Sequence, residues 1–336
     1  MIKKDFFINL SIDKNITSSQ NAGTSAAFSA ISGLAYLSSK YDLNKKFFYR
    51  LGFGYSAAMI TLLNHELSGH SLRALEFNCN PHGLEIDPLL LSGSIHTGCT
   101  GSMHIQKDTI ISLGGIQANY LLAQKISDNL FVHEQEIDPI TGIGYILSAA
   151  DQIEYNYINH NNNPGHDVNN YVEDMEIMYG NKSISRNIIK SHGFLSFLDP
   201  ILFASVYSAI TGRNVNVPVL SIGNIGVMPF ARSIFTPYGV IEKKFGAYII
   251  TDHTPIKVGF SFGKQFKTHE SKDLSQWSHK YSGSGKFAGL KDSEVVEEYM
   301  AYGFDISVLR LFTFNKLNIG ASAAFWKQPE LFVEDP

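Results

Sequence analysis

The spacing of hydrophobic and polar residues changes near residue 215. Before that point the apolar segments are rich in Ala and Leu and are typical of helices, and polar connectors such as "NHNNNPGHDVNN" (159–170) separate them. After it, apolar and polar residues alternate, as in "IKVGFSFGK" (256–264) and "LNIGASAAFW" (317–326), with "TPYG" (236–239) as a turn. The pattern predicts an α+β protein, with a helical core over 1–215 and an antiparallel β module over 216–336 that contains a polar excursion at 264–299.

Composition narrows the class of protein. The 336 residues carry a net charge of -4, 17% are charged and 44% are hydrophobic, so nothing indicates a nucleic-acid partner. Cys79 and Cys99 could form a single bridge, although reduced thiols are the simpler expectation. The N-terminal "MIKKDFFINLSIDKN" has too short an apolar run for a cleaved signal peptide.

Several apolar segments before residue 215 leave the relation to a membrane open. They are "AGTSAAFSAISGLAYLS" (22–38), "LGFGYSAAMITLL" (51–63), "DTIISLGGIQANYLLA" (108–123), "PITGIGYILSAA" (139–150) and "FLSFLDPILFASVYSAITG" (194–212). Each is short or interrupted by polar residues, which favours buried helices in a cytoplasmic protein. The alternative is a membrane-associated core whose polar residues serve an internal site.

The stretch "NHELSGHSLRALEF" (64–77) carries the clearest chemistry. His65 and His70 flank Glu66 as in the zinc-peptidase pattern H-E-x-x-H, but with one additional residue. On a regular α-helix residues five apart diverge by about 140°, so both imidazoles reach one metal only if a π-bulge absorbs the extra residue. Gly69 is the residue that would tolerate such a distortion most easily.

Two known families resemble this motif. "HELSGH" is similar to the H-E-x-x-G-H signature of dipeptidyl peptidase III enzymes, which implies that His65 and His70 bind zinc and that Glu66 acts on water. The paired glutamates of "VVEEYMAYGFD" (295–305) match the second motif of that family poorly. The order of "LLNHELSGH", "SLGGIQANYLLA" and "FLDPILF" resembles that of site-2 proteases more broadly, which implies that Asp199 is the third ligand, although Pro200 replaces the expected glycine.

The third ligand and the substrate contacts remain open at this level. Asp199 follows an apolar run, where a charge is costly unless it is paired or metal-bound, but it is also an ideal N-cap for a helix that begins at Pro200. Glu154, in a probable helix, is the substitute ligand. We predict that Arg73 and Asn119 contact substrate, although a salt bridge from Arg73 to Glu76 or Asp87 competes. A second metal cluster of His82, His96 and His104 is a weaker alternative.

The sequence therefore predicts a zinc-dependent peptidase that acts on a peptide or protein, with Glu66 as general base. A noncatalytic scaffold or membrane-associated β protein with structural histidines is the competing hypothesis. A nonproteolytic zinc hydrolase would share the same metal chemistry.

Overall fold

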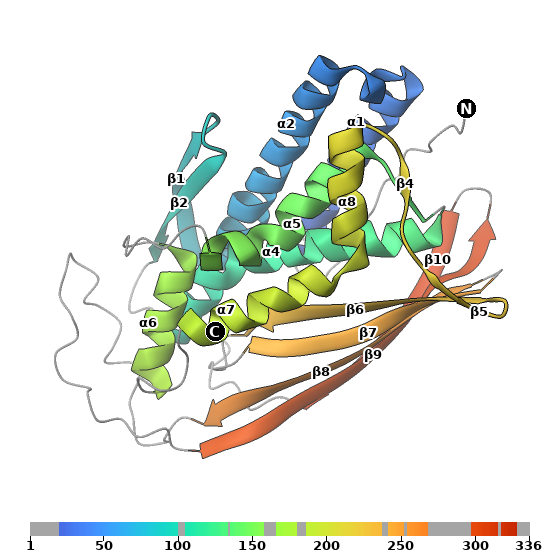
Figure 1. The fold of residues 1–336 in the computed structure, drawn as a ribbon. Helices are drawn as coiled ribbons and strands as arrows, with labels where there is room; N and C mark the ends of the chain where they lie inside the picture. Colours follow the sequence, from blue (N-terminus) through green and yellow to red (C-terminus); the bar gives the residue numbers. More distant parts are fainter. Residues whose placement is uncertain are drawn as a thin grey trace.

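The secondary structure changes character where the sequence predicts it. The computed structural model describes residues 20–99, 105–133, 135–157, 166–179, 186–236, 241–251, 254–267, 297–314 and 317–327. Helices dominate up to Thr211, and an antiparallel sheet follows (Figure 1). The predicted α+β class is confirmed. The N-terminal segment, the last three residues of the "TPYG" turn and most of the polar excursion lie outside the described residues.

The helices come first along the chain. The α-helices are α1 (Gln20–Lys40), α2 (Phe47–Leu63), α3 (Leu72–Glu76), α4 (Ile105–Val132), α5 (Pro139–Tyr157), α6 (Asp167–Tyr179), α7 (Arg186–Gly193) and α8 (Pro200–Thr211). Two short 3₁₀-helices, η2 (Leu43–Lys45) and η4 (Phe194–Leu198), precede α2 and α8, and a π-helix, η3 (Asn64–Ser71), joins α2 to α3.

Three antiparallel sheets accompany the helices. The largest has the order β10-β9-β8-β7-β6-β5, and the others are the pairs β1–β2 and β3–β4. The strands are β1 (Cys79–Asp87), β2 (Ser92–Cys99), β3 (Glu136–Ile137), β4 (Val215–Asn216), β5 (Leu220–Ile222), β6 (Ile225–Phe235), β7 (Ile241–Ile250), β8 (Pro255–Lys267), β9 (Glu297–Phe314) and β10 (Leu317–Lys327). The predicted excursion at 264–299 is therefore too wide at both ends.

One hydrophobic core joins the helices to the six-stranded sheet. Ile31 of α1, Leu122 of α4 and Ile201 of α8 belong to the same buried cluster as Met228 of β6 and Tyr248 of β7. In Figure 1, α4, α7 and α8 lie on one side of this sheet. The secondary structure thus changes from helix to strand near residue 215, but the helices and the sheet share one hydrophobic core.

The β1–β2 hairpin is an element that the hydrophobic pattern did not predict. It includes "HTGC" (96–99), and Gly83 adopts a positive φ of 62° at the irregularity in its register. Cys79 and Cys99 face each other across the strands and form a disulfide, so the expectation of reduced thiols is wrong. The bridge ties together the two strands that pack against η3.

The apolar segments form helices, and none of those described is long and apolar enough to cross a membrane by itself. One bent pair, Asn187–Leu198 with Pro200–Thr211, meets the length and composition criteria only when its two parts are taken together.

Candidate metal centre

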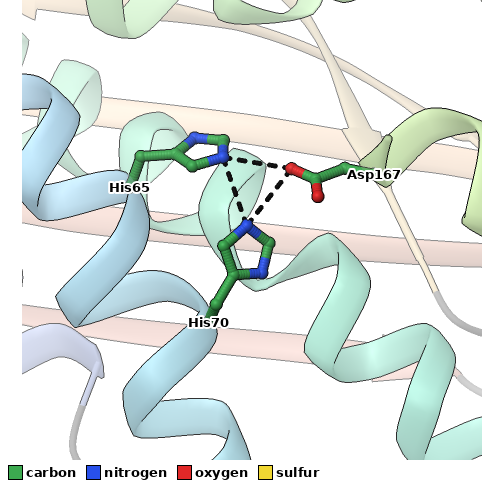
Figure 2. Close-up of side chains that lie close together, drawn as sticks. All are labelled: His65, His70 and Asp167. Carbon is green, nitrogen blue, oxygen red and sulfur yellow. Dashed lines mark hydrogen bonds and ion pairs between the residues drawn. The ribbon is translucent and has the colours of Figure 1, made fainter. Parts of the chain in front are cut away.

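The π-helix resolves the anomalous histidine spacing. Residues Asn64–Ser71 are wound as a π-helix between α2 and α3, so residues five apart lie nearly above one another. Figure 2 shows the imidazoles of His65 and His70 pointing toward one another and toward Asp167, at the start of α6. The predicted π-bulge is confirmed, and all three side chains are largely buried.

The three facing atoms have the separations of a metal-ligand set. Asp167 Oδ2 lies 3.0 Å from His65 Nε2 and 3.2 Å from His70 Nε2, and the two Nε2 atoms are 3.2 Å apart. Ligands about 2.0–2.1 Å from a tetrahedral ion are separated by about 3.3 Å from one another. Two imidazoles and one carboxylate therefore form one face of a tetrahedron, and this group can hold a metal ion.

Glycines allow α4 to approach the π-helix closely. A Cβ on Gly69 would lie 2.5 Å from Gly115 Cα, and a Cβ on Gly115 would lie 2.2 Å from His65 Nε2. No side chain fits at either position without displacing its neighbour. Gly69 is thus required by close packing, in addition to the conformational tolerance predicted for it.

The remaining imidazole nitrogens are engaged by neighbouring groups. His70 Nδ1 lies 2.7 Å from the backbone carbonyl oxygen of Ile111, which can accept its N–H and leave Nε2 for a metal. His65 Nδ1 lies 3.3 Å from the side-chain amide nitrogen of Asn119, and the Asn64 amide donates to Asn119 Oδ1 at 3.1 Å. These contacts orient both rings, and His65 binds a metal through Nε2 when the Asn119 amide turns its oxygen toward the ring to accept the Nδ1–H. Asn119 therefore positions His65, and its contact with substrate stays a prediction.

The electrostatics of the cluster favour a cation. Burial opposes the charged form of Asp167, but the adjacent His70 and His65 hold the pKa of this carboxyl well below its usual range. Burial lowers the pKa of His70, and the Asp167 carboxylate outweighs that effect, so its pKa is raised above 6.5. A buried carboxylate beside two imidazoles thus attracts positive charge, which either a proton or a metal ion can supply.

Glu66 lies beside the cluster. Its side chain is buried, and a Cβ on Gly93 of β2 would lie 3.1 Å from Glu66 Oε1. Its charge contributes to raising the pKa of His70. Glu66 therefore lies between the π-helix and the hairpin, near the metal-ligand group.

Asp199 has a different role from the one predicted. Its Oδ1 accepts the backbone N–H of Ile201 at 2.9 Å, so it is the N-cap of α8. Its Oδ2 accepts a hydrogen bond from the Tyr145 hydroxyl and lies 3.8 Å from the Arg232 guanidinium. These partners balance its buried charge, and the carboxylate that joins the histidine pair is that of Asp167. The capping role, offered above as the alternative, is the one observed.

Asp167 was missed because its sequence context is that of a connector. It follows "NNNPGH" and occupies the first turn of α6, where an aspartate ordinarily serves the helix terminus. The available signal was the periodic apolar set after it, Val168, Tyr171 and Met175, which buries one face of α6 and directs its start into the core. Glu154 lies on α5 as expected, but its side chain is outside the described residues.

Two further predictions find structural explanations. Arg73 donates to Glu76 at 2.7 Å, which confirms the competing salt bridge, and to Gln20 and Gln117 at 3.3 and 3.2 Å. It thus ties α3 to α1 and α4, and its contact with substrate stays a prediction. His82 and His96 are cross-strand partners with ring centroids 6.2 Å apart, and His104 lies outside the described part of the chain.

The paired glutamates that match the second motif of dipeptidyl peptidase III enzymes poorly, Glu297 and Glu298, begin the strand β9. Comparisons with protein-family models, curated proteins and solved structures gave no match. The geometry of the site therefore carries the functional argument.

Proposed function

We propose that this protein is a zinc-dependent peptidase in which His65, His70 and Asp167 hold the metal and Glu66 is the general base. The observation that carries the proposal is the π-helix, which converts an unfavourable histidine spacing into a convergent pair facing a carboxylate. π-Helical turns are uncommon and are frequently found at functional sites, because they cost regular hydrogen bonding.

The donor set favours zinc over harder cations. Calcium and magnesium prefer oxygen ligands, whereas two imidazole nitrogens and one carboxylate oxygen suit a tetrahedral zinc ion. Three protein ligands leave a fourth position for water or substrate, which is the pattern of catalytic zinc sites.

Glu66 supplies the proton chemistry. Zinc bound at this site would lower the pKa of water and polarise a substrate carbonyl. Glu66 accepts a proton from the water that attacks the peptide carbonyl, and then returns it to the leaving amine. Its side chain is buried beside β2, next to the metal-ligand group and away from bulk water.

The position of β2 supports a peptide as substrate. Gly93 of this strand adjoins Glu66, and β2 pairs only with β1 among the strands that are described. An extended peptide can pair with a free strand edge through its main chain, whatever its side chains. Such pairing would place a scissile bond near the base.

Metal content is the first test. The purified protein should hold one zinc ion per chain, measured by elemental analysis, and His65→Ala, His70→Ala and Asp167→Ala should each lose it. His82→Ala, which removes an exposed histidine of the hairpin, is the matched control and should retain the metal. Unaltered zinc content in all three ligand variants would refute the site.

Catalysis is tested separately. Glu66→Gln should retain zinc and fold yet cleave peptides at least about 100-fold more slowly, whereas Glu76→Gln, an exposed glutamate on the same helical segment, should not differ from the parent. If a peptide library is not cleaved but small acyl substrates are, the nonproteolytic hydrolase is favoured. Zinc-free protein whose histidine variants change only stability would favour the noncatalytic scaffold.

A further inference from the structure

The six-stranded sheet buries ion pairs within the core on its helix-facing side and carries apolar side chains on its outward face. The face toward the helices buries Lys244 with Asp305 at 2.5 Å, and Lys257 with Asp128 of α4 at 2.8 Å. An antiparallel sheet with one solvated face normally carries its polar side chains on that face. Here charged side chains are paired on the buried face, so the outward face differs from that of an ordinary solvated sheet if its side chains are apolar.

A row of four phenylalanines crosses the outward face. Phe245 of β7 is paired with Phe260 of β8, Phe260 with Phe304 of β9, and Phe304 with Phe325 of β10. Their exposed fractions are 40%, 48%, 48% and 62%. Aromatic residues directly opposite each other on neighbouring strands stabilise a sheet, but they leave a large apolar surface in water.

Two aliphatic rows extend this surface. One row is Ala247, Val258, Ile306 and Ala323, and the next is Ile249, Ile256, Val308 and Ala321. We call these rows, together with the phenylalanine row, the phenylalanine face. It contains no charged residue, and the described helices pack on the other side of the sheet (Figure 1).

The size of this surface suits a protein interface. Strands lie about 4.8 Å apart and alternate residues of one strand about 6.7 Å apart, so each outward position covers roughly 32 Å². The twelve positions of the phenylalanine face therefore cover roughly 380 Å² of flat area, and the exposed fractions of its four phenylalanines alone amount to about two whole side chains, or roughly 400 Å² of accessible surface. Two copies in contact would bury about 800 Å² from the phenylalanines alone, and the partly exposed aliphatic rows bring the interface to about 1,200 Å², the lower end of the range of stable interfaces.

We propose that the phenylalanine face packs against the same face of a second copy of this chain. Two sheets pack face to face at about 10 Å, and a two-fold axis makes a uniform apolar surface complementary to itself. A bilayer interior is a poorer occupant, because the sheet formed by the described strands is open, and its edge strands β5 and β10 would bring main-chain groups into hydrocarbon. This inference is independent of the metal centre.

Sedimentation velocity of the full chain without detergent tests the proposal. The parent should be a dimer, and Phe304→Lys should dissociate it, with a dimer affinity at least about 100-fold weaker because the interface would bury an unpaired charge. Phe48→Lys is the matched control, since Phe48 is 82% exposed at the start of α2, and it should remain a dimer. A lysine at 304 is water-accessible in a single copy, so the variant should keep the parent's circular dichroism and zinc content.

A cross-linking experiment tests the same interface without requiring that the Phe304→Lys variant fold correctly. Both native cysteines are in the disulfide, so Ala247→Cys introduces the chain's one free thiol, on the phenylalanine face. A short bismaleimide should join two copies of Ala247→Cys but not of Gly52→Cys, an exposed position on α2. A monomeric parent, or a dimer that Phe304→Lys leaves intact, would overturn the proposal. A monomer that floats with lipid vesicles unless residue 304 is lysine would overturn it in favour of a bilayer.

Discussion

Gly115→Ala should weaken metal binding strongly through a single added methyl group. The added Cβ would lie 2.2 Å from His65 Nε2 and 2.4 Å from its Cε1. Because non-bonded carbon and nitrogen atoms need at least about 3.3 Å, the imidazole or α4 must move by about 1 Å. Metal–ligand distances tolerate about 0.2 Å, so His65 can no longer share an ion with its partners.

The expected effects can be measured independently. Zinc affinity, measured by competition with a chromophoric chelator, should fall at least about 100-fold. A change to a group that orients a metal ligand weakens affinity by about 10- to 100-fold, and displacing the ligand itself should weaken it at least as much. Denaturant unfolding of the metal-free protein should show a cost of about 1–3 kcal/mol, typical of overpacking a close contact.

The control distinguishes this clash from a general effect of replacing helical glycine. Gly52 also lies within a helix, but a Cβ there meets no atom within 4 Å. Gly52→Ala should stabilise the protein by about 0.5–1 kcal/mol and leave zinc affinity unchanged. If Gly115→Ala bound zinc as tightly as the parent, His65 would not be a ligand in this geometry, and the proposed centre would be wrong.

Two further predictions concern buried carboxyl groups away from the metal ligands. Asp199→Ala should destabilise the fold by about 3–5 kcal/mol in denaturant titrations, because it removes the α8 cap and leaves Arg232 without its buried counter-charge. The zinc content of this variant should equal that of the parent, and loss of zinc would instead indicate that Asp199 is a ligand. Burial raises the pKa of Asp108 to about 6. Burial and the nearby charge of Asp108 also raise the pKa of Asp174. Because the folded pKa of Asp108 exceeds its unfolded value, the protonated form stabilises the fold at low pH, and that contribution is lost as pH rises from about 4 through 6. Asp108→Asn should therefore gain about 2–3 kcal/mol relative to the parent at pH 8 and little at pH 4, and stability curves that stay parallel across this range would contradict the assignment.

Local features of this protein follow from the sequence alone. The change from helical to alternating spacing near residue 215 predicted the α+β class, because helix and strand place side chains with different periods. The five-residue spacing of His65 and His70 required a π-bulge if both were to bind one ion, and the π-helix is present. The Asp199–Pro200 pair marked a helix start, since both residues satisfy needs that arise within a single turn.

Only the tertiary structure decided which residues meet. Asp167 is separated from His65 by 102 positions, and its role depends on how α6 packs against α4, which in turn packs against the π-helix. Gly115 is essential because an imidazole from another helix occupies the space of its missing side chain, and nothing in its own neighbours in the sequence encodes that approach. Likewise, each phenylalanine of the outward row belongs to an ordinary strand pattern, and strand register alone aligned the four into one surface. Contacts between distant segments depend on the packing of whole elements, which periodicity along the chain does not specify.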